Sequence, residues 1–284
     1  MTRQATTAED AFAALGSEPR LTVLRHLADA ELDGDSALTF TELYDRFEMD
    51  STSRLSYHLD QLTDVFVQKT DDGYSLTPAG DRVVRAVLSG TFSEQASFEP
   101  TTVDGKCPSC GHTQLGARYQ DRLLTVRCPS CETTVVTYDL PPSGTKHRSA
   151  MEVLRSCNRR VHHEYAVALR GTCAQCGGPT EVTIEESDGI SRFTCVTDCT
   201  QCRMRLFAPL EARLLHHPAV VSFYWQCGID IVDIELWNLA TYLEQWETEY
   251  LDGEEFRCAV TVTHGSETLR TVVDADLDVT IVDT

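Results

Sequence analysis

The stretch CPSCGHTQLGARYQDRLLTVRCPSC, residues 107–131, decides the fold of the middle of this chain. Two cysteines separated by two residues can both bind one tetrahedral metal ion, and a second such pair completes its coordination shell. Residues 111–127 separate the two pairs in this stretch, and they contain the strand-like runs of a hairpin. The spacing therefore predicts a zinc ribbon. Its expected zinc ligands are Cys107, Cys110, Cys128 and Cys131.

The pattern repeats as Cys173-Ala-Gln-Cys176 and Cys199-Thr-Gln-Cys202, with residues 177–198 between the pairs. These four cysteines predict a second zinc ribbon. Cys195 is an alternative to Cys199 as a ligand, and it would shorten the spacing between the pairs. We favour Cys199 because it restores the two-residue separation within the pair.

Both predicted zinc ions are structural rather than catalytic, because four thiolate ligands leave no open coordination position. The alternative is that these cysteines are free or form disulfides. Residues 1–10, MTRQATTAED, lack the apolar core of an export signal, and no apolar run in the sequence is long enough to cross a membrane. We therefore expect a cytoplasmic protein without a membrane segment, in which disulfides are disfavoured.

A helix is predicted over residues 146–169, after the chain-breaking PPSG at 141–144. Its apolar stripe includes Cys157, which we interpret as a buried core residue. On the other side Arg148, Arg155, Arg159 and His162 form a basic face. That face is either a contact for phosphate or an acidic partner, or a solvated surface paired with acidic neighbours.

A weaker pattern favours an enzyme. His162-His163-Glu164, followed by the Cys173 pair, loosely resembles the motif order of zinc deaminases. No proline precedes Cys173, however, and the segment between Glu164 and Cys173 is short. The second cysteine pair explains a metal better, so we expect no catalytic residues and no enzymatic activity.

The N-terminal stretch alternates apolar residues at helical spacing. Helices are predicted at 8–15 and 20–32, then one that contains Leu43 and Phe47, then one from Ser51 or Thr52 to residue 62. The turn signal Asp71-Asp72-Gly73 predicts a hairpin, and a last helix begins at Thr77-Pro78 and ends near Gly90.

The segments ALGSEPRLTVLRHLAD, LTFTELYDRF, STSRLSYHLDQL and DGYSLTPAG make residues 8–90 resemble the ArsR-like winged helix-turn-helix regulators of archaea and bacteria. This resemblance implies that the helix at 51–62 enters the major groove of double-stranded DNA, that the hairpin touches the DNA backbone, and that the protein is a homodimer. The implied DNA-contacting residues are Ser51, Thr52, Ser53, Arg54, Ser56, Tyr57, His58, Gln61 and Lys69.

Three features depart from that family pattern. Asp64 stands where a glycine usually precedes the first hairpin strand, and Asp71 and Asp72 would face phosphates unfavourably. Residues 1–106 contain no cysteine, so the metal-sensing cysteine pair known in the family is missing. The alternative interpretation is a winged helix used for dimerisation or protein docking.

The C-terminal stretch 211–284 is predicted to be helical first and then β-structured, with strands at 256–263, 268–273 and 277–282. Trp225, Trp237 and Trp246 lie close together in the sequence. Such aromatic density favours a small core or a dimer interface over a ligand site. We assign this region a dimerisation or effector role.

The net charge of −20 arises from 44 acidic and 24 basic residues, of which only three are lysines. An acidic protein either repels nucleic acid, or belongs to a salt-adapted proteome in which acidic surfaces are general. The scarcity of lysine favours a halophilic protein. Residues 1–100 carry −10, residues 101–209 carry +2 and residues 210–284 carry −12. The wider chain resembles winged-helix regulators of salt-loving archaea with a cysteine-rich C-terminal half.

These observations predict an α+β protein that is a sequence-specific transcriptional regulator with two structural zinc ions. The alternative is an adaptor that contacts RNA polymerase, because a winged helix followed by a four-cysteine ribbon also resembles transcription factor E alpha. The predicted organisation is a DNA-binding domain at 1–92, a linker at 93–105, a first ribbon at 106–140, a connecting helix at 141–170, a second ribbon at 171–210 and the C-terminal region at 211–284.

Overall fold

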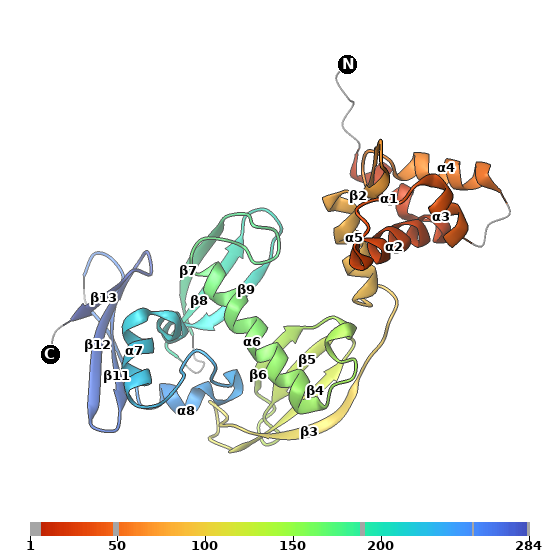
Figure 1. The fold of residues 1–284 in the computed structure, drawn as a ribbon. Helices are drawn as coiled ribbons and strands as arrows, with labels where there is room; N and C mark the ends of the chain where they lie inside the picture. Colours follow the sequence, from red (N-terminus) through yellow and green to blue (C-terminus); the bar gives the residue numbers. More distant parts are fainter. Residues whose placement is uncertain (1–6, 48–50, 188–190, 252, 283–284) are drawn as a thin grey trace. The chain divides into compact units, whose positions relative to one another are not determined.

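The computed structural model describes residues 7–47, 51–187, 191–251 and 253–282. The chain divides into two compact units, residues 1–94 and 95–284. Figure 1 shows helices and a short hairpin in the first unit, and three antiparallel sheets with helices in the second. In the described ranges, no helix is both long and apolar enough to cross a membrane.

The described residues of the N-terminal unit form five helices and one hairpin, in the order that the sequence predicts. The caps explain several boundaries: the side chains of Thr7 and Thr39 accept hydrogen bonds from backbone N–H groups three residues on, and Gly34 ends the second helix in a left-handed conformation. The elements are α1 (Ala8–Leu15), α2 (Glu18–Asp33), α3 (Phe40–Arg46), α4 (Thr52–Leu62), β1 (Val67–Thr70), β2 (Gly73–Leu76) and α5 (Pro78–Leu88).

The core of this unit forms where α4 packs on α2. Leu55, Leu59 and Leu62 of α4 are at most 1% exposed, and they pack with Leu24 and Leu27 of α2. The spacing of the three leucines places them on one face of the helix. The opposite face of α4 therefore remains free for polar residues.

The C-terminal unit begins with a four-stranded antiparallel sheet and a helix. The sheet has the order β3-β4-β5-β6, with β3 (Phe98–Asp104), β4 (Gln114–Gln120), β5 (Leu123–Arg127) and β6 (Thr134–Asp139). A short 3-10 turn, η1 (Pro142–Gly144), leads to the long helix α6 (Ala150–Ala168). Ser149 caps α6 through a reciprocal pair of hydrogen bonds with Glu152.

The linker predicted at 93–105 is wrong in its second half, because residues 98–104 form β3. The composition is misleading here: Pro100 is compatible with an edge strand, and the register shifts between Phe98 and Thr101 where that proline lies. Val103 of β3 is 3% exposed and belongs to the core of the sheet. Burial of one face of this segment against the sheet therefore stabilises it as a strand, although its sequence is mostly polar.

The remaining elements are two further sheets and a helical segment between them. The three-stranded sheet contains β7 (Thr180–Glu186), β8 (Phe193–Cys199) and β9 (Arg205–Pro209). The helical segment contains η2 (Leu210–His216), α7 (Pro218–Gln226), η3 (Leu236–Asn238) and α8 (Leu239–Leu243). The last sheet contains β10 (Glu247–Tyr250), β11 (Arg257–His264), β12 (Glu267–Asp274) and β13 (Val279–Val282), of which β10 was not predicted.

The helix α6 belongs to two hydrophobic cores. Leu154 and Cys157 pack into the core of the sheet β3–β6, whereas Tyr165 packs into the core that contains Phe193 of β8. Figure 1 shows α6 running from the first of these sheets toward the second. Cys157 is 2% exposed, so its predicted burial is confirmed. Because α6 packs into both cores, the two sheets and the helix form one compact unit.

Candidate metal centres and exposed surfaces

The four Cys-x-x-Cys turns share one backbone conformation. In each turn the fourth residue after the first cysteine has a left-handed φ, which is +72° at Gly111, +60° at Glu132, +74° at Gly177 and +61° at Arg203. This conformation reverses the chain so that both sulfur atoms point the same way. Glycine adopts it without steric cost, whereas Glu132 and Arg203 do so against their preference.

The same two hydrogen bonds close every turn. The N–H of the first cysteine donates to the carbonyl five residues on, at 2.8–2.9 Å, and the N–H of the fourth following residue donates back to the cysteine carbonyl at 2.9–3.2 Å. These backbone hydrogen bonds are therefore made within each turn itself. The first cysteines of the four turns are Cys107, Cys128, Cys173 and Cys199.

The turns bring the predicted ligands together in two groups of four sulfur atoms. In the first group, the Sγ atoms of Cys107 and Cys131 are 3.5 Å apart, as are those of Cys110 and Cys128. In each group all four sulfur atoms lie within 4.8 Å of one another. The first cysteine group is Cys107, Cys110, Cys128 and Cys131.

The second cysteine group contains Cys199 and not Cys195. Its Sγ–Sγ distances are 3.6 Å for Cys173 and Cys202 and 3.5 Å for Cys176 and Cys199. Cys195 is completely buried on β8, in the core that also contains Tyr165. The geometry therefore places Cys199, and not Cys195, among the four clustered sulfur atoms.

The sulfur spacing fits a tetrahedral metal ion and not disulfides. A disulfide requires about 2.05 Å between sulfur atoms. Zn–S bonds of about 2.3 Å in a tetrahedron place the sulfur atoms about 3.8 Å apart. The observed 3.5–3.6 Å is close to the tetrahedral value, and all 12 cysteines are free. Both groups are therefore positioned to hold a metal ion.

One thiol in each group is held toward the thiolate form that a metal needs. Hydrogen bonds from the side chain and backbone of Thr133 lower the pKa of the Cys131 thiol to about 6. In the second group, the backbone N–H groups of Cys202 and Gln201 lower the pKa of Cys199 to about 6. Donors directed at sulfur stabilise negative charge there, which assists binding of a cation.

A second thiol in each group shows the opposite shift. Backbone hydrogen bonds at His112 and Met204 lower the pKa of Cys110 and Cys202, but the neighbouring sulfur atoms outweigh them and raise it to about 12. Sulfur atoms this close to one another do not all ionise without a cation between them. Binding of a metal ion would therefore release protons from these thiols.

Each group has a buried half and an exposed half. The first cysteine of every turn is at most 3% exposed, and the second cysteine is exposed. Four protein ligands at these distances leave no position for a water molecule or substrate on the metal. A metal ion held by this donor set would tie two turns of the chain to one point.

The other four cysteines lie outside the two groups. Burial raises the pKa of Cys157 and Cys195 to about 12 and that of Cys258 to about 11. Cys227, at the C-terminal end of α7, is partly exposed. The buried three behave as apolar core residues rather than as metal ligands.

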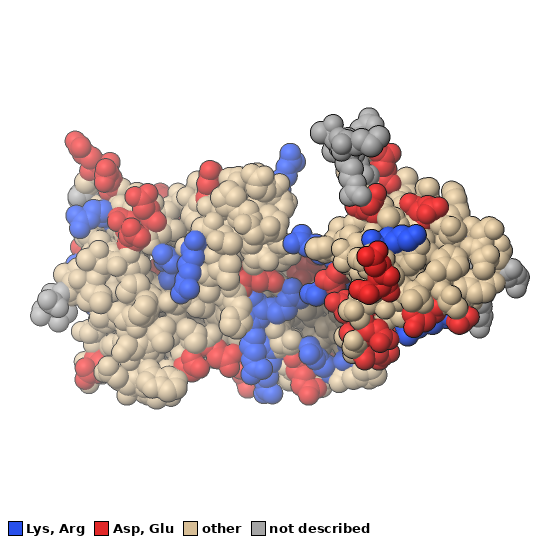
Figure 2. Space-filling model, turned by 45° about the horizontal axis from the view of Figure 1, so that its top comes forward, with Lys and Arg blue, Asp and Glu red and all other residues tan. Residues whose placement is uncertain are grey.

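The basic face predicted on α6 exists, but without His162. His162 is 5% exposed, and its Nε2 lies 2.9 Å from the carbonyl oxygen of Ile234. A shallow groove along the helix is lined instead by Arg148, Arg155, Arg159, Arg160 and His163, together with Glu152 and Glu164. Figure 2 shows basic side chains gathered on the surface with acidic ones beside them.

Part of this basic face is neutralised by ion pairs. Arg160 pairs with Glu164 at 3.0 Å, and Arg159 lies 3.6 Å from Asp233. Such pairs near the surface contribute little to stability, but they reduce the charge that a partner would meet. Arg155 is exposed on the same face, so both interpretations of this face stay open.

The residues of α4 that the sequence predicts to contact DNA lie on its outer face. Thr52, Ser53, Arg54, Ser56, Tyr57 and Gln61 are exposed, while Ser51 and His58 are partly buried. Tyr57 is 58% exposed and makes an edge contact with His58. The first turn of α4 contains no acidic residue, so its N-terminal amides face no competing carboxylate from the helix itself.

Arg20 of α2 is a basic residue of this surface that sequence analysis missed. It lowers the pKa of His58, as Arg54 also does, although burial of the imidazole is the larger cause. Arg20, Arg54 and His58 therefore lie close together. The signal for Arg20 was weak, because it stands in a different helix and nothing in its local pattern points toward α4.

The hairpin is anchored to the rest of the N-terminal unit through Leu38. Leu38 and Tyr74 exchange backbone hydrogen bonds of 2.9 and 2.8 Å. A side chain at Gly73, whose φ is +132°, would clash with the backbone carbonyl of Leu38. Glycine is therefore required here, because it lets the hairpin turn pack directly against the backbone of Leu38. Lys69 is exposed on β1, 5.4 Å from the ring of Tyr74.

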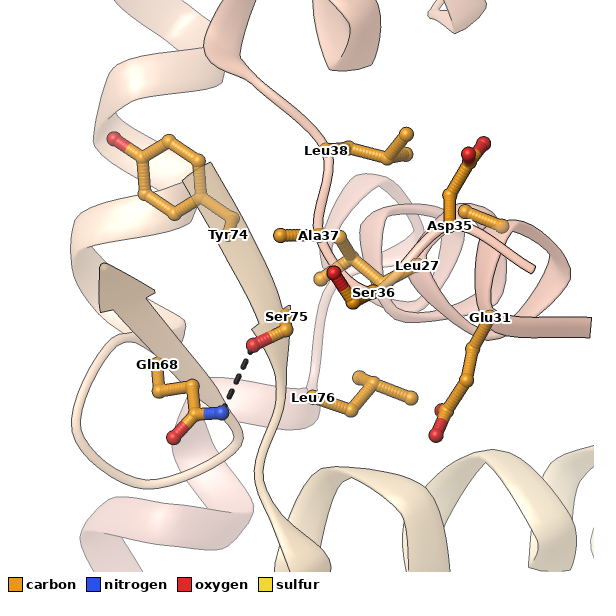
Figure 3. Close-up of a pocket in the computed structure, with 11 residues that line it drawn as sticks. Leu27, Glu31, Asp35, Ser36, Ala37, Leu38, Gln68, Tyr74, Ser75 and Leu76 are labelled. Carbon is orange, nitrogen blue, oxygen red and sulfur yellow. Dashed lines mark hydrogen bonds between the residues drawn. The ribbon is translucent and has the colours of Figure 1, made fainter. Parts of the chain in front are cut away.

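A small cavity of about 130 Å³ lies between the hairpin and α2. Figure 3 shows Gln68 donating a hydrogen bond to Ser75 on one wall, with Leu38 and Leu27 on the other. Its volume is below the range of about 300–1,000 Å³ that ligand sites occupy. This cavity is therefore a packing feature of the hairpin attachment.

The fold and the two cysteine groups define a class of protein: a mixed α+β chain with two four-cysteine metal sites. Residues 104–279 match the family described as domain of unknown function DUF7351. Because this match covers more than half of the chain, the chain belongs to that family. Residues 8–87 match a second family, domain of unknown function DUF7347. No curated protein and no solved structure matches the chain.

Proposed function

We propose that the chain is a sequence-specific DNA-binding transcriptional regulator, with a winged helix-turn-helix of the ArsR-like type at its N-terminus and two structural zinc ions in its C-terminal unit. The observation that carries the proposal is the division of α4 into two faces. Leu55, Leu59 and Leu62 hold the helix in the core, and the polar residues of its other face are exposed.

The chemistry of the exposed face suits base recognition. Arginine can make paired hydrogen bonds to guanine, glutamine to adenine, and serine and threonine to several bases. Arg54 and Gln61 supply the first two, and Ser53 and Ser56 are exposed on the same helix. The N-terminal amides of α4 add a position for a backbone phosphate.

The basic cluster next to α4 supports the same orientation on DNA. Arg20 and Arg54 both act on His58, so positive charge gathers beside the helix in a unit that is otherwise acidic. Lys69 adds a cation on the hairpin, while Asp71 and Asp72 at its turn oppose phosphate contact. In a salt-adapted protein, affinity must come from base contacts more than from counterion release, because that contribution falls steeply with salt.

Homodimer formation is supported by α1. Within α1, all of whose residues are described, no side chain is buried, and Phe12 is 76% exposed. A dimer would cover this apolar helix and would present two copies of α4 to a near-palindromic site. The size of the protein in solution, measured by light scattering for the wild type and for Phe12→Glu, tests this part of the proposal.

Zinc is the metal that the donor set favours. Four thiolates in tetrahedral geometry are typical of structural zinc, and the iron–sulfur alternative would give a coloured protein. X-ray absorption at the zinc edge, with four sulfur ligands at both ions, is the expected result. A water ligand at either ion would contradict a structural role and would favour an enzyme.

The DNA-binding proposal is tested by gel shift against genomic fragments at high salt. We expect a small set of selected fragments for the wild type. The double variant Arg54→Ala/Tyr57→Ala should lose at least a hundredfold in affinity and keep its zinc content and its thermal unfolding profile. Unchanged binding by that variant would refute the assignment of α4 as the recognition helix.

The same experiment separates the regulator from the adaptor. An adaptor like transcription factor E would bind DNA without sequence preference and would co-purify with RNA polymerase. Selected fragments without polymerase favour the regulator. Polymerase without selected fragments favours the adaptor.

A further inference from the structure

A cavity of about 320 Å³ lies within the C-terminal unit, between elements far apart in the sequence. Its walls come from β6, from α6 and from the segment that contains β9 and η2. Leu236 and Leu239 close it from a fourth side. The volume is within the range of small-molecule sites, about 300–1,000 Å³.

Two residues that line this cavity each have a polar atom that is buried without a hydrogen-bond partner. Tyr165 lines the cavity, is 7% exposed, and has a hydroxyl that contacts no donor or acceptor among the described residues. His216 also lines the cavity, and its Nε2 atom is likewise buried without a hydrogen-bond partner. Buried polar groups in native proteins are nearly always satisfied, so a bound molecule at this place would complete the hydrogen bonding.

The rest of the lining is mostly apolar and carries no negative charge. Val136, Val161, Leu206 and Leu215 are among the apolar residues that enclose it. Although the chain has 44 acidic residues, none of the described residues that line the cavity is Asp or Glu. The composition of the cavity lining therefore differs from that of the chain as a whole, which is strongly acidic.

Two arginines, Arg170 and Arg213, act on His216, although neither lines the cavity. After burial, the groups that most lower the pKa of His216 are His162, His163, Arg170 and Arg213, which are all basic. Burial also raises the pKa of Tyr165, so its hydroxyl remains a donor. A neutral imidazole can likewise donate from Nε2 in one tautomer. Two donors in a mostly apolar wall without carboxylates, with two arginines nearby, favour an anion with an apolar body.

We infer that this cavity binds a small organic carboxylate with an aromatic or branched aliphatic body, whose carboxylate accepts hydrogen bonds from the Tyr165 hydroxyl and from Nε2 of His216. The apolar walls then cover the body of the ligand. This binding does not depend on the proposed DNA-binding function, since every lining residue belongs to the C-terminal unit.

The test uses the full-length, zinc-loaded protein with benzoate and phenylacetate as probes and benzamide as the uncharged analogue. Isothermal titration calorimetry at constant salt should give saturable binding of at least one carboxylate, at least tenfold tighter than benzamide. Tyr165→Phe and His216→Leu should each weaken carboxylate binding at least tenfold. No saturable binding of either carboxylate to the wild type would overturn the inference.

Tyr138→Phe is the matched control, because it also removes one tyrosine hydroxyl. That hydroxyl donates to Glu164 at 2.8 Å, and Tyr138 is outside the cavity lining. We expect Tyr138→Phe to leave carboxylate binding unchanged. Equal loss in both tyrosine variants, or no loss in Tyr165→Phe and His216→Leu, would contradict the site.

Thermal unfolding without probe gives an independent readout. A hydroxyl that is buried without a partner makes no favourable contact in the empty protein, so Tyr165→Phe should unfold at the same temperature as the wild type or higher. A lower unfolding temperature would mean that the hydroxyl already has a structural partner, and it would overturn the inference.

Discussion

Asn158 Nδ2 donates a hydrogen bond of 3.0 Å to the carbonyl oxygen of Ile234, across 76 positions of the chain. The Oδ1 atom of the same side chain accepts from the N–H of Leu236 at 2.9 Å, and Asn158 is 3% exposed. The side-chain amide of Asn158 therefore supplies the hydrogen-bond partners that the backbone groups of Ile234 and Leu236 do not find within their own irregular segment. Next to it, Trp237 packs in the core of the sheet β3–β6.

Replacing Asn158 with Leu should destabilise the C-terminal unit by about 2–3 kcal/mol, because the N–H of Leu236 loses its acceptor and one bond to Ile234 is lost. Urea unfolding followed by tryptophan fluorescence measures the change. Asn238→Ala is the control, since among the described residues its side chain bonds only to the exposed Thr241, and it should cost less than about 1 kcal/mol. Equal costs for the two variants would contradict the importance of the Asn158 bonds.

Metal content should follow the two cysteine groups independently. Cys107→Ser and Cys202→Ser should each leave one metal ion per chain in place of two, measured by plasma mass spectrometry on purified protein. Cys195→Ala should keep both ions, because Cys195 lies in the core and outside the groups. A metal loss in Cys195→Ala would make that residue a ligand.

The left-handed position of the turns can be tested by a matched pair of substitutions. Gly177→Ala should lower the free energy of unfolding by about 1–2 kcal/mol, because among the described atoms none lies within 4 Å of the added Cβ and only the backbone preference changes. Arg203→Gly should raise it by up to about 1 kcal/mol for the opposite reason. Chemical denaturation of the zinc-loaded protein measures the free energy of unfolding of both variants. A change of the same sign in both would refute the explanation from backbone preference.

Stability should fall between pH 6.5 and pH 4 in part because of His216. Burial, and then the basic neighbours His162, His163, Arg170 and Arg213, lower the pKa of His216 from 6.5 to about 4. The unfolded chain then binds a proton that the folded chain does not, so acid favours unfolding in this window. His216→Leu should lose less stability between pH 7 and pH 5 than the wild type in thermal unfolding. An identical loss would exclude His216 as a contributor.

If the DNA-binding proposal holds, Lys69→Ala should weaken binding to all sequences similarly. Lys69 is exposed on β1, where a cation meets phosphate rather than a base edge. The slope of log affinity against log salt should become shallower by about one. By contrast, Arg54→Ala should reduce the preference for selected fragments over random DNA. A sequence-dependent effect of Lys69→Ala would place it at a base.

The sequence was most informative where the structure is local. The hairpin signal at residues 71–73 and the helix caps predicted the elements of the N-terminal unit, because each depends on neighbouring residues. Asp64 is instructive here: it stands where the resembled family has glycine, and it adopts a left-handed φ of +77°. Aspartate is one of the few residues other than glycine that tolerate this conformation.

The errors of sequence analysis lie where distant segments meet. The strand β3 was predicted as a linker, and β10 was missed, because each is an edge strand whose pairing partner supplies the order. His162 was placed on the basic face of α6, although the carbonyl of Ile234 draws it into the interior. Helical spacing alone does not tell which polar residue will find a buried partner.

By itself, the sequence determined the two four-cysteine metal sites, since each turn contains within itself the backbone bonds that aim the sulfur atoms. Only the tertiary structure decided the cavity at Tyr165 and His216, the bond between Asn158 and Ile234, and the placement of Arg20 beside α4. The physical reason is the separation along the sequence between the residues that interact. A turn is specified by local dihedral preferences, whereas a cavity or a buried hydrogen bond exists only after packing has joined segments that no local pattern connects.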